Sequence, residues 1–196
     1  MIACALTLAA FVAACGSSAS SHSISSHSAG GHTPGLSVAT ANNNGAYVTA
    51  GGVTYQLQIS RELNQYSAED LEYVKGLPAG TPAPTPDQEW YGVFLWAKNQ
   101  TDVPLTTTDN FELVDTQGNT YLPIRLDPYV NPFAWTAQRL PPQQTEPLPN
   151  TPASMGPTQG GLLLFKVNDS VYANRPLTLY ILGPDDQQQA SISLDL

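Results

Sequence analysis

The sequence is poor in charge, and in positive charge above all. Seven Lys and Arg stand against sixteen Asp and Glu, which gives a formal net charge of −9 over 196 residues. Charged residues make up only 12% of the chain, about half the share that is typical of globular domains. Because so few cations cannot neutralise a row of phosphates, we expect neither nucleic-acid binding nor adhesion to an anionic membrane through a basic patch.

The residue types that catalysis uses most often are missing after position 45. Both cysteines and all three histidines precede that position: Cys4, Cys15, His22, His27 and His32. A Ser–His or Cys–His nucleophile, or a zinc site with nitrogen or sulfur ligands, would therefore depend on the N-terminal segment. The chain also contains no Ser-x-x-Lys, nucleophile-elbow or phosphate-binding glycine motif. We therefore predict a protein that is not an enzyme and has no catalytic residue, cofactor or metal site.

The chain begins with an apolar run and carries no charged side chain before Arg61. Residues 2–15 are apolar apart from Thr7. Fourteen residues of helix span about 21 Å, less than the roughly 30 Å of a bilayer's hydrocarbon core. This length is typical of the apolar part of a secretory signal, and small residues follow it as a cleavage site requires.

Residues 12–18, Val-Ala-Ala-Cys-Gly-Ser-Ser, resemble the lipobox of exported bacterial lipoproteins. The resemblance implies a signal peptide over residues 1–14 and acylation of Cys15, which would anchor the chain to the bacterial membrane on its extracytoplasmic side. No basic residue precedes the apolar run. Two alternatives therefore stay open: a true start upstream of Met1, and a plain signal peptide with an incidental cysteine.

Residues 15–45 are rich in Ser, Ala, Gly, His and Asn and contain few large apolar side chains. Such a composition cannot offset the entropy lost on ordering, which predicts a disordered tether. The three histidines recur every five residues, so a metal-binding tract is one interpretation. Solvated linker histidines are the favoured one, because this spacing preorganises no site.

Residues 46–196 alternate between apolar and polar positions in several short segments, which predicts strands. Segment 90–97 is apolar on both faces and indicates a central strand that is covered on both sides. A hairpin is expected over residues 111–121, with Gly118 in its turn. A short helix is expected from Ser67, which can cap its start, to Gly76, with Leu71 and Val74 toward the core. The pattern as a whole predicts a β-sandwich.

This segment also resembles the uncharacterised immunoglobulin-like, telokin-like domains of exported bacterial lipoproteins. The resemblance covers roughly residues 47–196 and rests on the aromatic strand that ends in Asn99, on residues 111–121, and on the Pro/Gly-rich approach to residues 162–167. It implies an all-β, immunoglobulin-like antiparallel sandwich whose function is unknown. The chain lacks the Cys…Trp…Cys spacing of antibody domains, so Trp96 is expected to pack without a disulfide.

A long proline-rich loop over residues 125–161 is the strongest candidate for a binding surface. Aromatic and arginine side chains are common anchors of recognition surfaces, and this loop contains five: Tyr129, Phe133, Trp135, Arg125 and Arg139. The alternative, which we favour from the sequence, is that the rings fold back and complete the core.

The sequence thus predicts a non-catalytic, lipid-anchored binding or accessory module of the bacterial cell envelope, with an envelope protein or a glycan as its partner. One rival is a cell-wall carbohydrate-binding module or a glycosidase that uses two of the sixteen carboxylates. The other rival is a metal-handling protein that uses the tether histidines.

Overall fold

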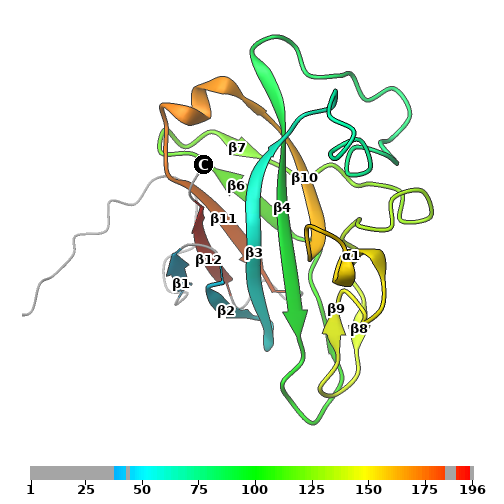
Figure 1. Ribbon diagram of the computed structural model, residues 1–196. Helices are drawn as coiled ribbons and strands as arrows, with labels where there is room; N and C mark the ends of the chain where they lie inside the picture. The colour runs from blue at the N-terminus through cyan, green and yellow to red at the C-terminus, as the bar shows by residue number, and fades with distance from the viewer. Residues whose placement is uncertain (1–37, 43–44, 184–188, 195–196) are drawn as a thin grey trace, which may run out of the picture.

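The computed structural model describes residues 38–42, 45–183 and 189–194. Two sheets pack face to face (Figure 1). The strands of the first sheet follow one another in the order β1 (Val38–Asn42), β12 (Gln189–Leu194), β11 (Leu177–Leu182), β6 (Phe111–Val114) and β7 (Thr120–Tyr121). In order across the second lie β10 (Gly161–Asn168), β4 (Gln88–Lys98), β3 (Val53–Leu63) and β2 (Tyr47–Ala50).

Five shorter elements lie in the proline-rich segment and on either side of it. β9 (Thr145–Glu146) pairs with β4, and β5 (Leu105–Thr106) pairs with β8 (Arg139–Leu140). The helical elements of the described residues are α1 (Pro152–Met155) and the 3₁₀ turn η1 (Asp169–Tyr172). The predicted all-β, mainly antiparallel sandwich is confirmed, and the one short α-helix of the described residues lies in the proline-rich segment. The pair of β1 with β12 departs from the antiparallel pattern, because these two strands run parallel.

The central strand β4 is buried on both faces, as its sequence predicts. Tyr91, Val93 and Leu95 point into the core between the two sheets, and Trp90 and Phe94 point to the opposite side. The first core is completed mainly by alternate residues of β3, β10, β6, β11 and β12. The strands expected from alternation at 53–60, 111–121, 162–167 and 177–182 are all present.

A second core covers the outer face of β4 and β10. Tyr73 packs edge-on against Phe94 and Phe133, with ring centroids 5.1 and 4.8 Å away. The Asn131 amide nitrogen donates hydrogen bonds of 3.0 Å to the carbonyls of Tyr73 and Lys75, which joins two covering segments. The proline-rich segment therefore serves as the outer layer of the second sheet. The predicted folding back of its rings holds for Phe133 and Trp135 but not for the exposed Tyr129.

The predicted helix over residues 67–75 is wrong, because the chain forms a series of turns there. Its hydrogen bonds include short-range ones, from the N–H of Asp70 to the carbonyl of Ser67 and from the N–H of Tyr73 to the carbonyl of Asp70. Of its apolar side chains, Tyr73 is buried and Val74 is half-buried against the second core, as predicted for Val74, whereas Leu71 is exposed.

The physical reason is the position of Asp70. Its carboxylate lies 2.6 Å from the Arg61 guanidinium and accepts a hydrogen bond of 2.9 Å from the backbone N–H of Asn64. These contacts hold the start of the segment close to the end of β3. From the sequence, Asp70 was expected in the first turn of a helix. No local pattern indicated its ion pair with Arg61.

The strand β1 lies before the predicted boundary between tether and domain at residues 45 and 46. β1 pairs with β12 over residues that had been assigned to the tether, with Val38 opposite Gln189. Backbone pairing of this kind needs no apolar side chains, so a search for hydrophobic patterning misses it. The predicted signal peptide over residues 1–14, Cys15 and the three tether histidines lie outside the described residues.

We predict that Gly160→Ala destabilises the fold by about 3 kcal/mol. Gly160 is buried with a φ of +119°, and a Cβ there would lie 2.9 Å from the backbone of Phe94 and Leu95 in the central strand. Urea denaturation measures the loss. The matched control is Gly118→Ala, at a φ of +85° with open space around it, which should cost only about 1 kcal/mol. Equal losses would contradict the packing argument.

Candidate functional site

The candidate site lies where the proline-rich segment returns to β4. Asn99, directly after β4, is completely buried. Its amide nitrogen donates hydrogen bonds to the carbonyls of Val103, Leu140 and Pro141, at 2.8, 3.0 and 3.1 Å. This buried amide fixes the β5–β8 ribbon against the end of β4 and thereby places the short strand β9 beside it (Figure 1).

β9 carries Glu146 opposite Ala97 of β4, and only 4% of this glutamate is exposed. The Thr107 hydroxyl donates a hydrogen bond of 3.0 Å to its Oε2 atom. Hydrogen bonding from the Gln138 side chain and from the Thr136 backbone N–H also favours the ionised carboxylate. Three donors thus approach one buried carboxyl group.

Burial nevertheless raises the pKa of Glu146 to about 7, since desolvation outweighs the three hydrogen bonds. No cation lies within ion-pair distance of Glu146 among the described residues, whose ion pairs join Arg61 to Asp70, Lys75 to Glu72 and Arg125 to Asp109. A buried carboxyl group without a counter-ion at an accessible cavity is a common mark of a functional site.

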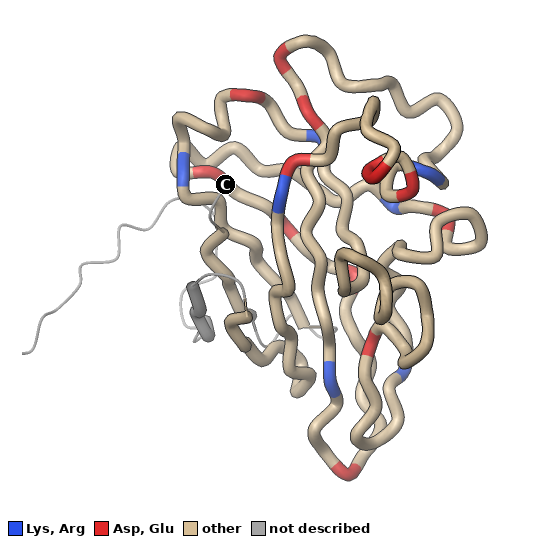
Figure 2. Tube along the Cα trace, in the orientation of Figure 1, with Lys and Arg blue, Asp and Glu red and all other residues tan. Residues whose placement is uncertain are grey.

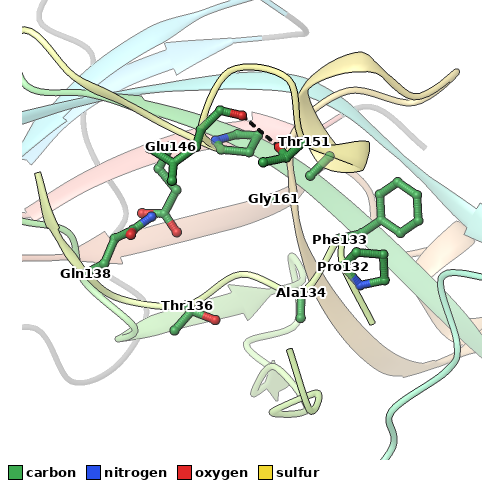
Figure 3. A pocket seen from close by; sticks show the side chains of 11 residues that line it. Pro132, Phe133, Ala134, Thr136, Gln138, Glu146, Thr151 and Gly161 are labelled. Atoms are coloured by element: carbon green, nitrogen blue, oxygen red, sulfur yellow. Dashed lines mark hydrogen bonds between the residues drawn. The ribbon is translucent and has the colours of Figure 1, made fainter. Parts of the chain in front are cut away.

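Glu146 lines a cavity of about 180 Å³. Figure 3 shows Glu146 and Gln138 on one side of the cavity and Phe133 with Pro132 on the opposite side. The remaining walls come from Ala134, Thr136, Pro147, Leu148, Thr151, Ala153 and Gly161. The Thr151 hydroxyl is occupied, because it donates to the Leu148 carbonyl at 2.7 Å. Glu146 is the single titratable side chain among these lining residues.

Two of the five loop residues singled out from the sequence have a packing role. Phe133 is 9% exposed and lies in the second core, at the wall of the cavity. Trp135 packs edge-on against Phe111 at 5.6 Å, and its indole N–H donates to the Thr108 carbonyl at 2.8 Å.

The other three loop residues lie on the surface and do not line the cavity. Tyr129 is 98% exposed. Arg125 forms an exposed ion pair of 2.7 Å with Asp109, and Arg139 is exposed in β8. The structure therefore does not bring the five predicted residues together into one surface.

Glu146 was not among the site residues predicted from the sequence. Its one distinguishing feature in the sequence is isolation, because it is the only acidic residue between Asp127 and Asp169. A lone glutamate in a proline-rich, nearly uncharged segment was a usable sign of an unusual environment. Its burial depends on the pairing of β9 with β4, which no local pattern announces.

A pair of carboxyl groups lies at the opposite end of β4 from Glu146. The Tyr172 hydroxyl lies 2.9 Å from Oε2 of Glu89 and 3.3 Å from Oε2 of Glu62. Partial burial raises the pKa of Glu89, and the nearby charges of Glu62 and Asp169 raise it further. Tyr172 therefore bridges two carboxyl groups at the start of β4 and the end of β3.

No protein-family model matches this chain, and no curated protein matches it. Among solved structures, the yjhA protein of Bacillus subtilis is similar in fold. It has a TM-score of 0.53 at 12% identity and covers 79% of this chain and 100% of its own. This likeness supports the fold alone.

Two further structures match less well. An uncharacterised β-sandwich protein of Clostridium difficile has a TM-score of 0.44 at 10% identity and covers 84% of this chain and 99% of its own. The "putative lipoprotein" ycdA of Bacillus subtilis has a TM-score of 0.46 at 11% identity and covers 78% of this chain and 39% of its own. Within the described ranges, no helix has the length and apolar character needed to cross a bilayer.

We predict that Trp135→Ala destabilises the protein by about 3 kcal/mol, because it removes a ring from the first core. Tyr129→Ala should change stability by less than about 0.5 kcal/mol, since that ring is exposed. Thermal or urea unfolding of both variants checks the pair. A Trp135→Ala variant as stable as the unaltered chain would contradict the packing role of this residue.

Glu146 also predicts a pH dependence of stability. The folded chain keeps the Glu146 proton up to about pH 7, whereas the unfolded chain loses it near the ordinary value of 4.5. The folded state therefore binds more protons between these values, and the free energy of unfolding should fall by about 3 kcal/mol as the pH rises through this window. Glu146→Gln should remove most of that fall, as measured by urea denaturation at pH 5 and pH 8.

The control for this measurement is Glu69→Gln, which makes the same change in charge at an exposed position and should keep the slope. The raised pKa of Glu89 adds a slope of the same sign in every variant. The lowered pKa values of Asp70 and Asp115 act at more acidic pH, outside the measured range. A Glu146→Gln variant with an unaltered slope would show that Glu146 ionises normally.

Proposed function

We propose that this chain is a non-catalytic binding module of the bacterial cell envelope, held at the extracytoplasmic face of a membrane by acyl chains on Cys15. The observation that carries the proposal is the cavity at Glu146. It combines apolar walls with a few polar groups and one buried carboxyl, which is the usual composition of a small-ligand site.

The rigidity of the cavity supports a binding role. Its wall residues are attached to the second sheet through the pair of β9 with β4 and through the contact of Ala134 with Leu162 of β10. A site that is built on packed strands keeps its shape before the ligand arrives, which lowers the entropy lost on binding. Acid–base catalysis of glycosidic cleavage needs a second carboxyl group, and Glu146 is alone among the lining residues.

The envelope location rests on residues 12–18 of the sequence. Each buried CH₂ of an acyl chain contributes about 0.8 kcal/mol to membrane binding, and two or more chains are needed for stable anchoring. The first described strand begins at Val38, and residues 16–37 lie between it and the proposed anchor in the sequence.

A carbohydrate-directed protein or glycosidase is the second candidate function. It is favoured by the pair Glu62 and Glu89, which share the Tyr172 hydroxyl, and by the raised pKa of Glu89. Acid–base pairs in glycosidases have one carboxyl with such a raised pKa. Hydrolysis of a cell-wall glycan that is lost in Glu89→Gln would establish this candidate in place of the first.

The anchoring prediction is tested with the full chain in a bacterial host. The unaltered chain should sediment with the membrane fraction, and mass spectrometry should find acyl groups on Cys15. Cys15→Ser should move most of the protein to the soluble fraction. Cys4→Ser is the matched control and should leave it on the membrane. An unmodified Cys15 in the membrane fraction, or a Cys15→Ser variant that stays there, would contradict the proposal.

A further inference from the structure

We infer that the cavity binds a primary ammonium group, carried on a short aliphatic stem, with the Glu146 carboxylate as its counter-ion. The inference rests on the proposed function in one respect, because it takes this cavity as the ligand site of the module. It names the class of ligand and the side chain that recognises it.

The ionised carboxylate of Glu146 has no counter-ion among the described residues. A buried carboxylate is costly unless it is paired with a cation, and no described residue supplies one within ion-pair distance. A carboxylate can accept about four hydrogen bonds. Three donors are present, from Thr107, Gln138 and Thr136, so an acceptor position remains for a ligand.

The overall charge of the chain also favours a cationic ligand. The chain carries a net charge of −9, which favours approach by a cation and disfavours an anion. Charged residues are thinly spread, mostly over connecting segments (Figure 2). A neutral hydroxyl would occupy the free acceptor position and leave the buried charge uncompensated.

The size and the lining of the cavity fit an ammonium group on a short aliphatic stem. A dry cavity of about 150 Å³ accommodates a benzene molecule, so 180 Å³ is sufficient for a butylammonium group or for the side chain of a lysine. Phe133, Pro147, Leu148 and Ala153 offer apolar walls to the methylene groups. An ammonium has three N–H donors, and the Thr136 hydroxyl at the cavity wall is a further acceptor beside Glu146.

Amine binding should be coupled to ionisation of Glu146. The pKa of Glu146 in the free protein is about 7, so affinity should fall about tenfold per pH unit below that value. From β3, the Tyr55 hydroxyl is the titratable group that interacts with Glu146, and burial keeps it neutral by raising its pKa. Lys98 of β4 and Arg139 of β8 lie on adjoining strands with exposed side chains.

The experiment is an NMR and calorimetric titration of the full chain, purified in detergent, with n-butylammonium chloride at pH 8. 1-Butanol is the neutral analogue of similar shape and should bind at least tenfold more weakly. The Thr136 amide signal should shift with the amine, because that N–H hydrogen-bonds to Glu146. Equal binding of alcohol and amine, or binding of neither, would overturn the inference.

Two variants test whether the Glu146 carboxylate binds the amine. Glu146→Gln keeps the shape of the side chain and should weaken amine binding at least tenfold, whereas Glu69→Gln should bind as the unaltered chain does. Unchanged affinity in Glu146→Gln would overturn the inference. If Glu146→Gln fails to fold, the unaltered chain decides through its pH profile, since an affinity that is the same at pH 5 and pH 8 would also overturn it.

A last pair of ligands identifies the source of the amine. Capped Ala-Lys-Ala is compared with the same peptide acetylated at Nζ and with butylammonium. Tighter binding of the lysine peptide than of the free amine indicates a protein partner, and the reverse indicates a small metabolite. Loss of the signal on acetylation is expected in both cases. Acylation of Cys15 is measured separately, so a wrong envelope location and a wrong ligand class give different results.

Discussion

The burial of β4 on both faces is the constraint on which the rest of the structure depends. Its inner residues, such as Leu95, need the first sheet, and its outer residues, such as Phe94, need a second cover. Among the described residues, turns and irregular segments provide that second cover. The proline-rich chain between β7 and β10 is consequently ordered by hydrophobic contact, and its many prolines reduce the entropy that it loses on packing.

The candidate site is a consequence of this arrangement. The proline-rich segment covers the outer face of the second sheet and then returns to pair with β4 through β9. The cavity lies beside this return, and β9 places Glu146 in its wall. The desolvation of Glu146 works against folding, whereas a bound ammonium would compensate the charge. A residue that destabilises the free protein in this way is more easily explained by ligand binding than by a structural role.

The regular part of the fold was predictable from the sequence because strand alternation is local. Apolar residues on both faces of segment 90–97 and the glycine at 118 specified the central strand and a hairpin without reference to the rest of the chain. The expected helix after Ser67 failed because Asp70 interacts with Arg61 of a neighbouring strand. β1 was missed because it is held by backbone pairing with β12, which leaves no hydrophobic signature.

From the sequence alone follow the all-β class, the positions of most strands, and the expectation of a lipid anchor at Cys15, because all of these depend on residues that are close together in the chain. Only the tertiary structure decided which carboxylate lies in a cavity. Glu146 lies far along the chain from Ala97 and Thr107. It meets Ala97 through strand pairing and Thr107 through a hydrogen bond. Desolvation depends on everything that surrounds a group in space, so one glutamate among sixteen acids becomes distinctive only when the fold is complete.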